Sequence, residues 1–342
     1  MVEYPEAARP LSELEPKCDF FIGIDSDGCA FDTMEIKHKE CFTPNTIKLW
    51  SLQAVSKYAR EASEFVNLYS KWRGINRWPA LVMVFDLLRD RPEVLARNVV
   101  PPEAPLIREF IADEGYPKSN DGLKAFMAEY PDPELDTAWA WTHGVNETVA
   151  DMVHGVPPFP WLRESLSYLK DKADMIVVSA TPLEALTREW QEHDIARYVH
   201  VIAGQEMGKK ALHLKLAAAG KYAPDRILMI GDAPGDMNAA RANDALFYPI
   251  NPGSEEESWQ RFYEESVHVP LIVSRPGHVA PGVVDTAHLV SVGPDLIPTL
   301  CDYAGVDVPA SLPGRSIRAI AEGRDETPWR GFVVSETVGG RM

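Results

Sequence analysis

Two aspartates that directly follow a short apolar run are the side chains in this sequence best suited to do chemistry. Residues 20–24 read Phe-Phe-Ile-Gly-Ile and lead into Asp25, Ser26, Asp27 and Gly28. The run predicts a buried strand, and open α/β sheets bind ligands at the carboxyl ends of their strands. Two carboxylates held this close resist joint ionisation, so they need a cation or a shared proton. Mg²⁺, a hard cation that prefers oxygen ligands, meets that need.

A serine and a pair of lysines follow later in the chain, in positions of similar kind. A second apolar run, residues 175–178, ends at Ser179. Lys209 and Lys210 come directly after Gly208 and precede a helical pattern. A hydroxyl at a strand end and an ammonium group at a helix start are both suited to bind an anion.

The last of these segments ends in paired acids. Residues 227–230 form a third apolar run, and the chain continues as Gly-Asp-x-x-x-Asp, with the acids at Asp232 and Asp236. In this order, the motifs resemble those of the haloacid dehalogenase superfamily of phosphohydrolases, over about residues 15–265. The resemblance implies a doubly wound parallel α/β sheet, a helical cap domain inserted after the first strand, and Mg²⁺-dependent phosphoryl transfer.

The resemblance assigns a role to each residue of the first two motifs. Asp25 would be the nucleophile and would form an aspartyl-phosphate, while Asp27 would protonate the leaving alkoxide and then deprotonate the attacking water. Ser179 would donate a hydrogen bond to a phosphoryl oxygen, with Thr181 as the second candidate. Gly28 and neighbouring amides would cradle the phosphoryl oxygens.

The later motifs would supply positive charge and metal ligands. We prefer Lys209 to Lys210 as the residue that neutralises the nucleophile and the phosphoryl group, because Lys209 follows glycine and its separation from Asp232 resembles that of the family. Asp232 would bind Mg²⁺ directly, and Asp236 would bind it through water or orient the lysine. Together with the nucleophile, the main-chain carbonyl of Asp27 would complete the metal shell.

The elements that must position these residues alternate along the chain. Strand signals separated by helical periodicity are typical of a parallel α/β sheet, and they lie at residues 20–24, 174–179, 199–203, 226–230 and 245–250. We assign residues 1–32 and 157–266 to this core. Residues 33–156 carry only helical patterns, and we expect them to form the inserted cap.

The cap is expected to set substrate specificity, since the core contacts mainly the phosphate. Its densest basic and aromatic cluster is Lys-Trp-Arg-Gly-Ile-Asn-Arg-Trp at residues 71–78. A helix that breaks at Gly74 would point Arg73, Asn76 and Arg77 into the cleft, where two arginines would bind a second anionic group. In the alternative, these arginines pack their stems on tryptophans of the cap core.

From about residue 267 the sequence resembles a different family, the later part of type I sulfatases. The resemblance rests on Val-Ser-Arg-Pro-Gly-His-Val-Ala-Pro-Gly at 273–282, Leu-Pro-Gly-Arg-Ser at 312–316 and a strand-like run at 331–336. The sulfatase nucleophile pattern, Cys or Ser then x-Pro-x-Arg, is spelled by residues 311–315, in a loop where the family carries an unrelated segment. We therefore expect residues 267–342 to be a partial sulfatase-like segment of doubtful autonomy. A fused or misassembled gene product is preferred to a two-domain design.

Composition excludes several classes of partner. The 342 residues include 34 basic and 51 acidic side chains, a formal net charge of −17, which argues against nucleic acid or an anionic membrane surface as the main partner.

The four cysteines show no C-x-x-C spacing, so free thiols in a reducing compartment are expected. The first residues lack the regions of a signal peptide and no apolar run is long enough to span a bilayer, so we expect a cytoplasmic location.

The function predicted from these features is that of a Mg²⁺-dependent phosphatase acting on a small-molecule phosphomonoester. A phosphomutase of the same superfamily is the nearest alternative, and a requirement for a bisphosphate activator would identify it. A non-catalytic binding or scaffold protein is a third hypothesis, which the intact set of motif residues disfavours. Protein partners are not predicted.

Overall fold

The computed structural model describes residues 4–267, 292–309 and 314–324, and the chain divides into two compact units, residues 1–267 and 268–342. Each unit is described by itself. The sulfatase-like sequence at 273–282, the strand-like run at 331–336 and residues 311–313 of the nucleophile-like pattern lie outside the described residues.

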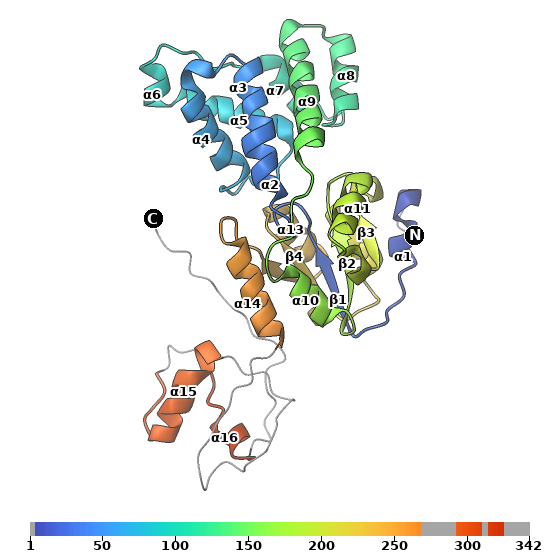
Figure 1. Cartoon of the computed structure of the whole chain (residues 1–342), viewed down its shortest axis with the longest axis vertical. Helices are drawn as coiled ribbons and strands as arrows, with labels where there is room; N and C mark the ends of the chain where they lie inside the picture. Colours follow the sequence, from blue (N-terminus) through green and yellow to red (C-terminus); the bar gives the residue numbers. More distant parts are fainter. Residues whose placement is uncertain (1–3, 268–291, 310–313, 325–342) are drawn as a thin grey trace. The chain divides into compact units, whose positions relative to one another are not determined.

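A five-stranded parallel sheet with the order β3-β2-β1-β4-β5 forms the centre of the first unit (Figure 1). Its strands are β1 (Phe20–Ile24), β2 (Ala173–Val178), β3 (Val201–Ala203), β4 (Ile227–Gly231) and β5 (Leu246–Pro249). Central β1 pairs in parallel with β2 on one side and β4 on the other. The strand order therefore reverses between β1 and β4, and a doubly wound sheet binds ligands beside such a switch point. The predicted α/β fold class is confirmed.

Helices cover both faces of this sheet. They are α1 (Arg9–Ser12), α10 (Leu162–Leu169), α11 (Leu183–Glu192), α12 (Lys210–Ala217), α13 (Pro234–Arg241) and α14 (Glu255–Val267). Successive side chains of a strand point to opposite faces, so Ile22 packs with Leu162 and Trp259 while Phe21 belongs to a separate cluster with Leu214. Burial on both faces explains why β1, β4 and residues 175–178 of β2 read as continuous apolar runs.

Between β1 and α10 the chain is helical, and Figure 1 shows these helices gathered together apart from the sheet. They are α2 (Thr33–Ile36), a π-helical stretch (Lys37–Phe42), α3 (Thr43–Leu49), α4 (Ser56–Asn67), α5 (Arg77–Arg89), α6 (Pro92–Leu95), α7 (Pro105–Ala112), α8 (Asn120–Glu129) and α9 (Pro133–Met152). The cap has a hydrophobic core of its own. In that core the rings of Trp78 and Trp141 meet edge to face at 5.4 Å.

The last helix of the first unit, α14, is part of the sheet core. Trp259 is fully buried, and its indole nitrogen donates a hydrogen bond of 2.7 Å to the carbonyl of Cys29. Phe262, one turn further along, packs edge to face on Trp259. The core of the first unit therefore extends into α14, at least as far as Phe262.

The described part of the second unit consists of α15 (Val292–Ala304), α16 (Arg318–Ala321) and the chain beside them. The guanidinium of Arg318 lies 3.0 Å from Asp302, and the backbone N–H of Ile317 donates to the Thr299 hydroxyl at 3.1 Å. These contacts join the two helices of this unit to each other.

Two expectations from composition can be compared with the described residues. The four cysteines are free thiols, as their spacing predicts. Within the described ranges, no helix combines the length and the apolar character needed to cross a bilayer.

We expect a chain that ends at Val267 to keep the unfolding midpoint of the first unit, because the three hydrophobic clusters of that unit lie before this residue. Trp259→Ala should instead lower the free energy of unfolding by about 3–5 kcal/mol, since it removes a fully buried indole. Urea denaturation followed by circular dichroism compares the two. A truncation as damaging as the substitution would show that the first unit is not self-sufficient.

Candidate active site

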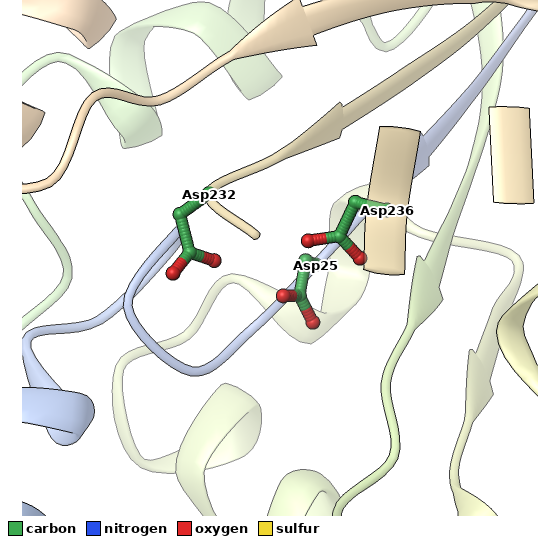
Figure 2. A group of neighbouring side chains, drawn as sticks. All are labelled: Asp25, Asp232 and Asp236. Atoms are coloured by element: carbon green, nitrogen blue, oxygen red, sulfur yellow. The ribbon is translucent and has the colours of Figure 1, made fainter. Parts of the chain in front are cut away.

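Three aspartates converge at the switch point of the sheet. Asp25 follows β1, Asp232 follows β4, and Asp236 lies in the first turn of α13. Figure 2 shows their carboxylates turned toward one another, and one oxygen of each lies within 4.8 Å of the others. Their side chains are buried, with exposed fractions of 3%, 9% and 0% for the whole residues. Burial and the charges of the other two carboxylates raise the pKa of Asp25 well above its ordinary value.

One lysine bridges two of these acids, and it is Lys210. Its ammonium nitrogen lies 2.8 Å from Asp25 Oδ2 and 2.6 Å from Asp236 Oδ1. Burial opposes the charge, yet the two carboxylates raise the pKa of Lys210 above its ordinary value. The preference for Lys209 was therefore wrong as far as this contact is concerned. Lys209 is exposed and, among the described residues, forms no ion pair at this cluster.

The reason lies in the start of α12. Lys209 is the extended N-cap residue, with φ −83° and ψ 153°, whereas Lys210 is the first helical residue. Adjacent side chains on either side of such a boundary point in different directions, so only one of two consecutive lysines reaches the cluster. Sequence spacing alone does not decide between two adjacent lysines, because helix boundaries are the least certain part of a prediction from sequence.

A cap arginine contacts the third acid. The Nε of Arg73 forms an ion pair with Asp232 Oδ2, and its Nη1 donates 2.9 Å to the carbonyl of Leu68. Both members of this pair are buried. The prediction that Arg73 binds an anionic group of a substrate is wrong for this conformation, because its guanidinium is bonded to a metal-site candidate instead.

Gly28 makes room for that ion pair. Its φ is +74°, and a Cβ at this position would lie 2.3 Å from Nη2 of Arg73 and 2.7 Å from Oδ2 of Asp232. Its own N–H donates 2.8 Å to the carbonyl of Phe31. The expected role of this amide in cradling a phosphoryl group is therefore not supported, since its N–H is already bonded to the Phe31 carbonyl.

Asp27 lies beside the cluster in a different environment. Its Oδ1 accepts hydrogen bonds from Thr33 at 2.5 Å and Lys37 at 2.6 Å, and its Oδ2 accepts one from Thr181 at 2.6 Å. Burial alone would raise the pKa of Asp27, but the charge of Lys37 and these hydrogen bonds lower it to about 2. Asp25 and Asp27 therefore differ in proton affinity although two residues separate them.

Lys37 and Thr33 were not singled out from the sequence. A signal was present, because residues four apart on a helix share one face and both follow closely on Asp27. Lys37 also begins the π-helical stretch, a feature frequent at functional sites.

Ser179 lies where the second motif predicts, directly after β2. It is buried, and its hydroxyl accepts a hydrogen bond of 3.1 Å from the backbone N–H of Thr181. It lines the same cavity as Asp25 and Lys210. Its proposed bond to a phosphoryl oxygen stays a prediction.

The remaining cap residues of the predicted set differ from each other in role. Asn76 caps α5, since its Oδ1 accepts the N–H of Trp78 at 3.0 Å, and its amide donates to the Lys118 carbonyl at 2.9 Å. Arg77 is half-buried and faces the space between cap and core. The cap bond and the bond to Lys118 account for both polar groups of Asn76, whereas Arg77 lines the cavity and, among the described residues, only its Nη1 has hydrogen-bond partners.

Two adjoining cavities connect the cap to the acids. The inner one, about 700 Å³, is lined by Asp25, Ser179, Lys210 and Asp232, and the outer one, about 730 Å³, is lined mainly by cap residues and α11. The residues that line both cavities are Asp27, His38, Phe42, Arg77, Ala180, Thr181 and Gln205. These dimensions suit a small molecule that occupies both.

The residues present fit a divalent cation. Asp232 Oδ2 forms the ion pair with Arg73, while Asp232 Oδ1 is buried and accepts no hydrogen bond from the described residues. The three clustered carboxylates face two cations, Lys210 and Arg73, so one negative charge is left uncompensated. An oxygen-only donor set with excess negative charge matches what Mg²⁺ prefers.

Comparison with protein families concerns the end of the chain. Residues 258–336 match the family model described as N-sulphoglucosamine sulphohydrolase, C-terminal. Two curated proteins of Bacteroides thetaiotaomicron are 38% identical over this part: an N-acetylglucosamine-6-O-sulfatase over 80 residues and a Delta 4,5-hexuronate-2-O-sulfatase over 76 residues. Each alignment covers 22% of this chain, and it spans only 14% and 16% of the two sulfatases. The predicted sulfatase-like segment is confirmed at the level of sequence.

Solved structures similar to this chain match its larger part. A haloacid dehalogenase-like hydrolase from Streptococcus pneumoniae is 16% identical with a TM-score of 0.39, over 70% of this chain and 90% of that one. A haloacid dehalogenase superfamily hydrolase of subfamily IA from Geobacter sulfurreducens is 15% identical with a TM-score of 0.36, over 69% and 89%. A haloacid dehalogenase-like hydrolase from Xanthomonas campestris is 9% identical with a TM-score of 0.37, over 74% and 96%. Likenesses of this size do not establish a shared activity.

We expect Lys210→Met to lower the free energy of unfolding at pH 7 by about 3–5 kcal/mol, because it leaves buried carboxylates without their counter-charge. The loss in free energy of unfolding caused by Lys210→Met should be smaller at pH 5 than at pH 7. A carboxyl such as Asp25, whose pKa is higher in the folded state, binds its proton more tightly there, so stability falls as pH rises through that pKa.

Lys209→Met is the matched control, and it should change the free energy of unfolding by less than about 0.5 kcal/mol, as exposed substitutions do. Urea denaturation of both variants at the two pH values makes the comparison. Equal losses in the two variants would contradict the assignment of Lys210.

Proposed function

We propose that this protein is a Mg²⁺-dependent phosphatase that hydrolyses a small-molecule phosphomonoester through an aspartyl-phosphate. The observation that carries the proposal is the buried set of Asp25, Asp232, Asp236 and Lys210 at the switch point of a parallel sheet, with Asp27 beside it. A binding protein would have little reason to bury three carboxylates together, since their repulsion costs stability unless cations offset it.

Asp25 is the residue best placed to attack phosphorus. It lines the inner cavity, and Lys210 holds its Oδ2 while its Oδ1 accepts the N–H of Ser26 at 2.8 Å. These contacts fix the orientation of the carboxylate, and orientation is a large part of the advantage of a bound nucleophile. Attack forms an O–P bond to Asp25 and breaks the bond from phosphorus to the ester oxygen.

Asp27 would carry the proton in both half-reactions. Hydrogen bonds from Thr33, Lys37 and Thr181 keep it a carboxylate before a substrate binds. An anionic phosphoryl group nearby would raise its proton affinity, which lets it protonate the leaving alkoxide. The same residue, once deprotonated, would take a proton from the water that hydrolyses the intermediate.

Positive charge around the inner cavity would stabilise the transferred group. Lys210 and the hydroxyl of Ser179 line that cavity. Asp25, Asp232 and the Asp27 main-chain carbonyl would hold Mg²⁺, with Asp236 binding it through water or orienting Lys210. The bound ion would supply positive charge that offsets the repulsion between the nucleophile and the phosphate. A chain of net charge −17 repels an anionic substrate, and the local positive charge of Lys210 and Mg²⁺ would offset that repulsion at the site.

The sulfatase-like segment is given no activity of its own in this proposal. The candidate catalytic residues precede it, and the aligned sulfatases are matched over a small part of their length. Asp25, Asp27 and Lys210 belong to the first unit alone.

Asp25→Asn should abolish Mg²⁺-dependent hydrolysis of a generic aryl phosphate, by about 10³-fold or more, because an amide oxygen is a poor nucleophile. Turnover is measured with Mg²⁺ and with EDTA. Asp19→Asn is the matched control, since Asp19 is an exposed acid just before β1, and it should keep wild-type activity. Metal-dependent turnover that survives in Asp25→Asn would rule out the aspartyl-phosphate route.

Arg73→Met should tighten Mg²⁺ binding, by about tenfold or more. Two effects oppose each other: Arg73 orients Asp232, which is worth about 10–100-fold in metal affinity, but its charge also repels a cation bound to the same carboxylate. At an effective dielectric constant of about 20, unit charges about 4 Å apart interact by about 4 kcal/mol, so the repulsion should dominate.

Calorimetric titration of Mg²⁺ without substrate measures this effect. Arg91→Met is the control, because Arg91 is a cap arginine whose partners are Glu61 and Glu93. Weaker binding in Arg73→Met would mean that the orienting effect exceeds the repulsion.

A further inference from the structure

Arg77 is held in place by neutral groups. Its Nη1 donates to the Thr142 hydroxyl and to Asn146 Oδ1, both at 2.8 Å, and its guanidinium lies 5.2 Å from the ring centre of Phe42. Among the described residues, no carboxylate forms an ion pair with it. Burial lowers the pKa of Arg77, in keeping with a cation that has lost water without gaining a counter-charge.

The other cap arginines that are buried or half-buried are paired with carboxylates, whereas Arg60 and Arg97 are exposed and donate to backbone carbonyls. Arg73 contacts Asp232, Arg91 contacts Glu61, and Arg89 and Arg108 share Asp86. Removing a charge from water is costly unless an opposite charge compensates it. A half-buried arginine without a carboxylate partner is therefore best explained by a ligand that supplies the negative charge.

The position of Arg77 indicates where that ligand would lie. Arg77 borders both the inner cavity of Asp25 and the outer cavity of the cap. Asp27 and Thr181 border both cavities too, so the passage between them leads past the proposed acid–base residue. A molecule with its phosphoryl group at Asp25 and its leaving group in the outer cavity would pass beside Arg77.

The hydrogen bonds behind Arg77 fix its direction. The Thr142 hydroxyl, which accepts from Nη1, itself donates a hydrogen bond of 2.8 Å to Asn120 Oδ1. The acceptors on one side of the guanidinium are thus occupied, while its other N–H groups have no hydrogen-bond partner among the described residues. A planar fork held from one side is suited to bind an oxyanion on the other.

Resting on the proposed phosphatase activity, we propose that Arg77 binds a second anionic group of the substrate, so that the substrate class is phosphomonoesters that also carry a carboxylate or similar oxyanion. Glu189 lines the outer cavity, but burial raises its pKa to about 7 and the Ser26 hydroxyl donates to it at 3.1 Å. With a pKa near neutrality, Glu189 carries less negative charge and therefore repels an incoming anion less.

Binding of non-hydrolysable probes tests this proposal without turnover. The intact protein with Mg²⁺ is titrated in a calorimeter with a series of ω-phosphonocarboxylates of increasing length and with alkylphosphonates of matched length. We expect the carboxylate to strengthen binding by about 10–100-fold at the best length, the range of a hydrogen-bonded charge pair. Arg77→Gln should reduce that advantage to about threefold or less, and Arg77→Lys should retain part of it.

Arg188→Gln is the matched control, since Arg188 is an exposed arginine that lines the same outer cavity. It should keep the carboxylate advantage, and thermal unfolding checks that each variant is folded. An advantage that persists in Arg77→Gln, or that is absent from the wild type at every length, would overturn the proposal. Either result leaves the phosphatase assignment to be judged separately, by Asp25-dependent turnover of an aryl phosphate.

Discussion

The rest of the site depends on the burial of three carboxylates in one small volume. Asp25, Asp232 and Asp236 repel one another, and the fold tolerates them because Lys210 and Arg73 bring positive charge into the same space. The two cations come from different places, one from the helix after β3 and one from the cap. One excess negative charge remains, and with it a buried oxygen of Asp232 that no described donor satisfies. An arrangement of this kind is costly for stability and is best explained by the binding of a cation and an anionic substrate.

The ion pair between Arg73 and Asp232 also joins the cap to the core. Residues 159 positions apart in the chain are bonded to each other, and Gly28 leaves the space in which they meet. Any movement of the cap that separates this pair exposes a buried acid and a buried guanidinium. The ionic state of the aspartate cluster and the position of the cap are therefore coupled in free energy, and each affects the other by the same amount.

Helix α14 belongs both to the sulfatase-like match in sequence and to the core of the first unit in the structure. The family model of the sulfatase-like segment begins at residue 258, inside this helix, yet Trp259 and Phe262 pack in the hydrophobic core of the first unit. The indole of Trp259 is bonded to the carbonyl of Cys29, in the loop after β1 that carries Asp25 and Asp27. The same ten or so residues therefore carry the sulfatase-like pattern and complete a core of another fold.

The sequence alone was sufficient to predict the strands, their parallel α/β arrangement and the acids at their ends, because apolar runs that stop at Asp25 and Asp232 are local features. Ser179 was likewise predicted at the end of β2. The choice between Lys209 and Lys210 was decided only by the tertiary structure, since it depends on which residue begins α12. The contact of Thr181 with Asp27 and the contact of Arg73 with Asp232 were also decided there, because each joins segments that are far apart in the sequence. Periodicity determines which face of an element is buried, whereas packing in three dimensions determines which charge meets which.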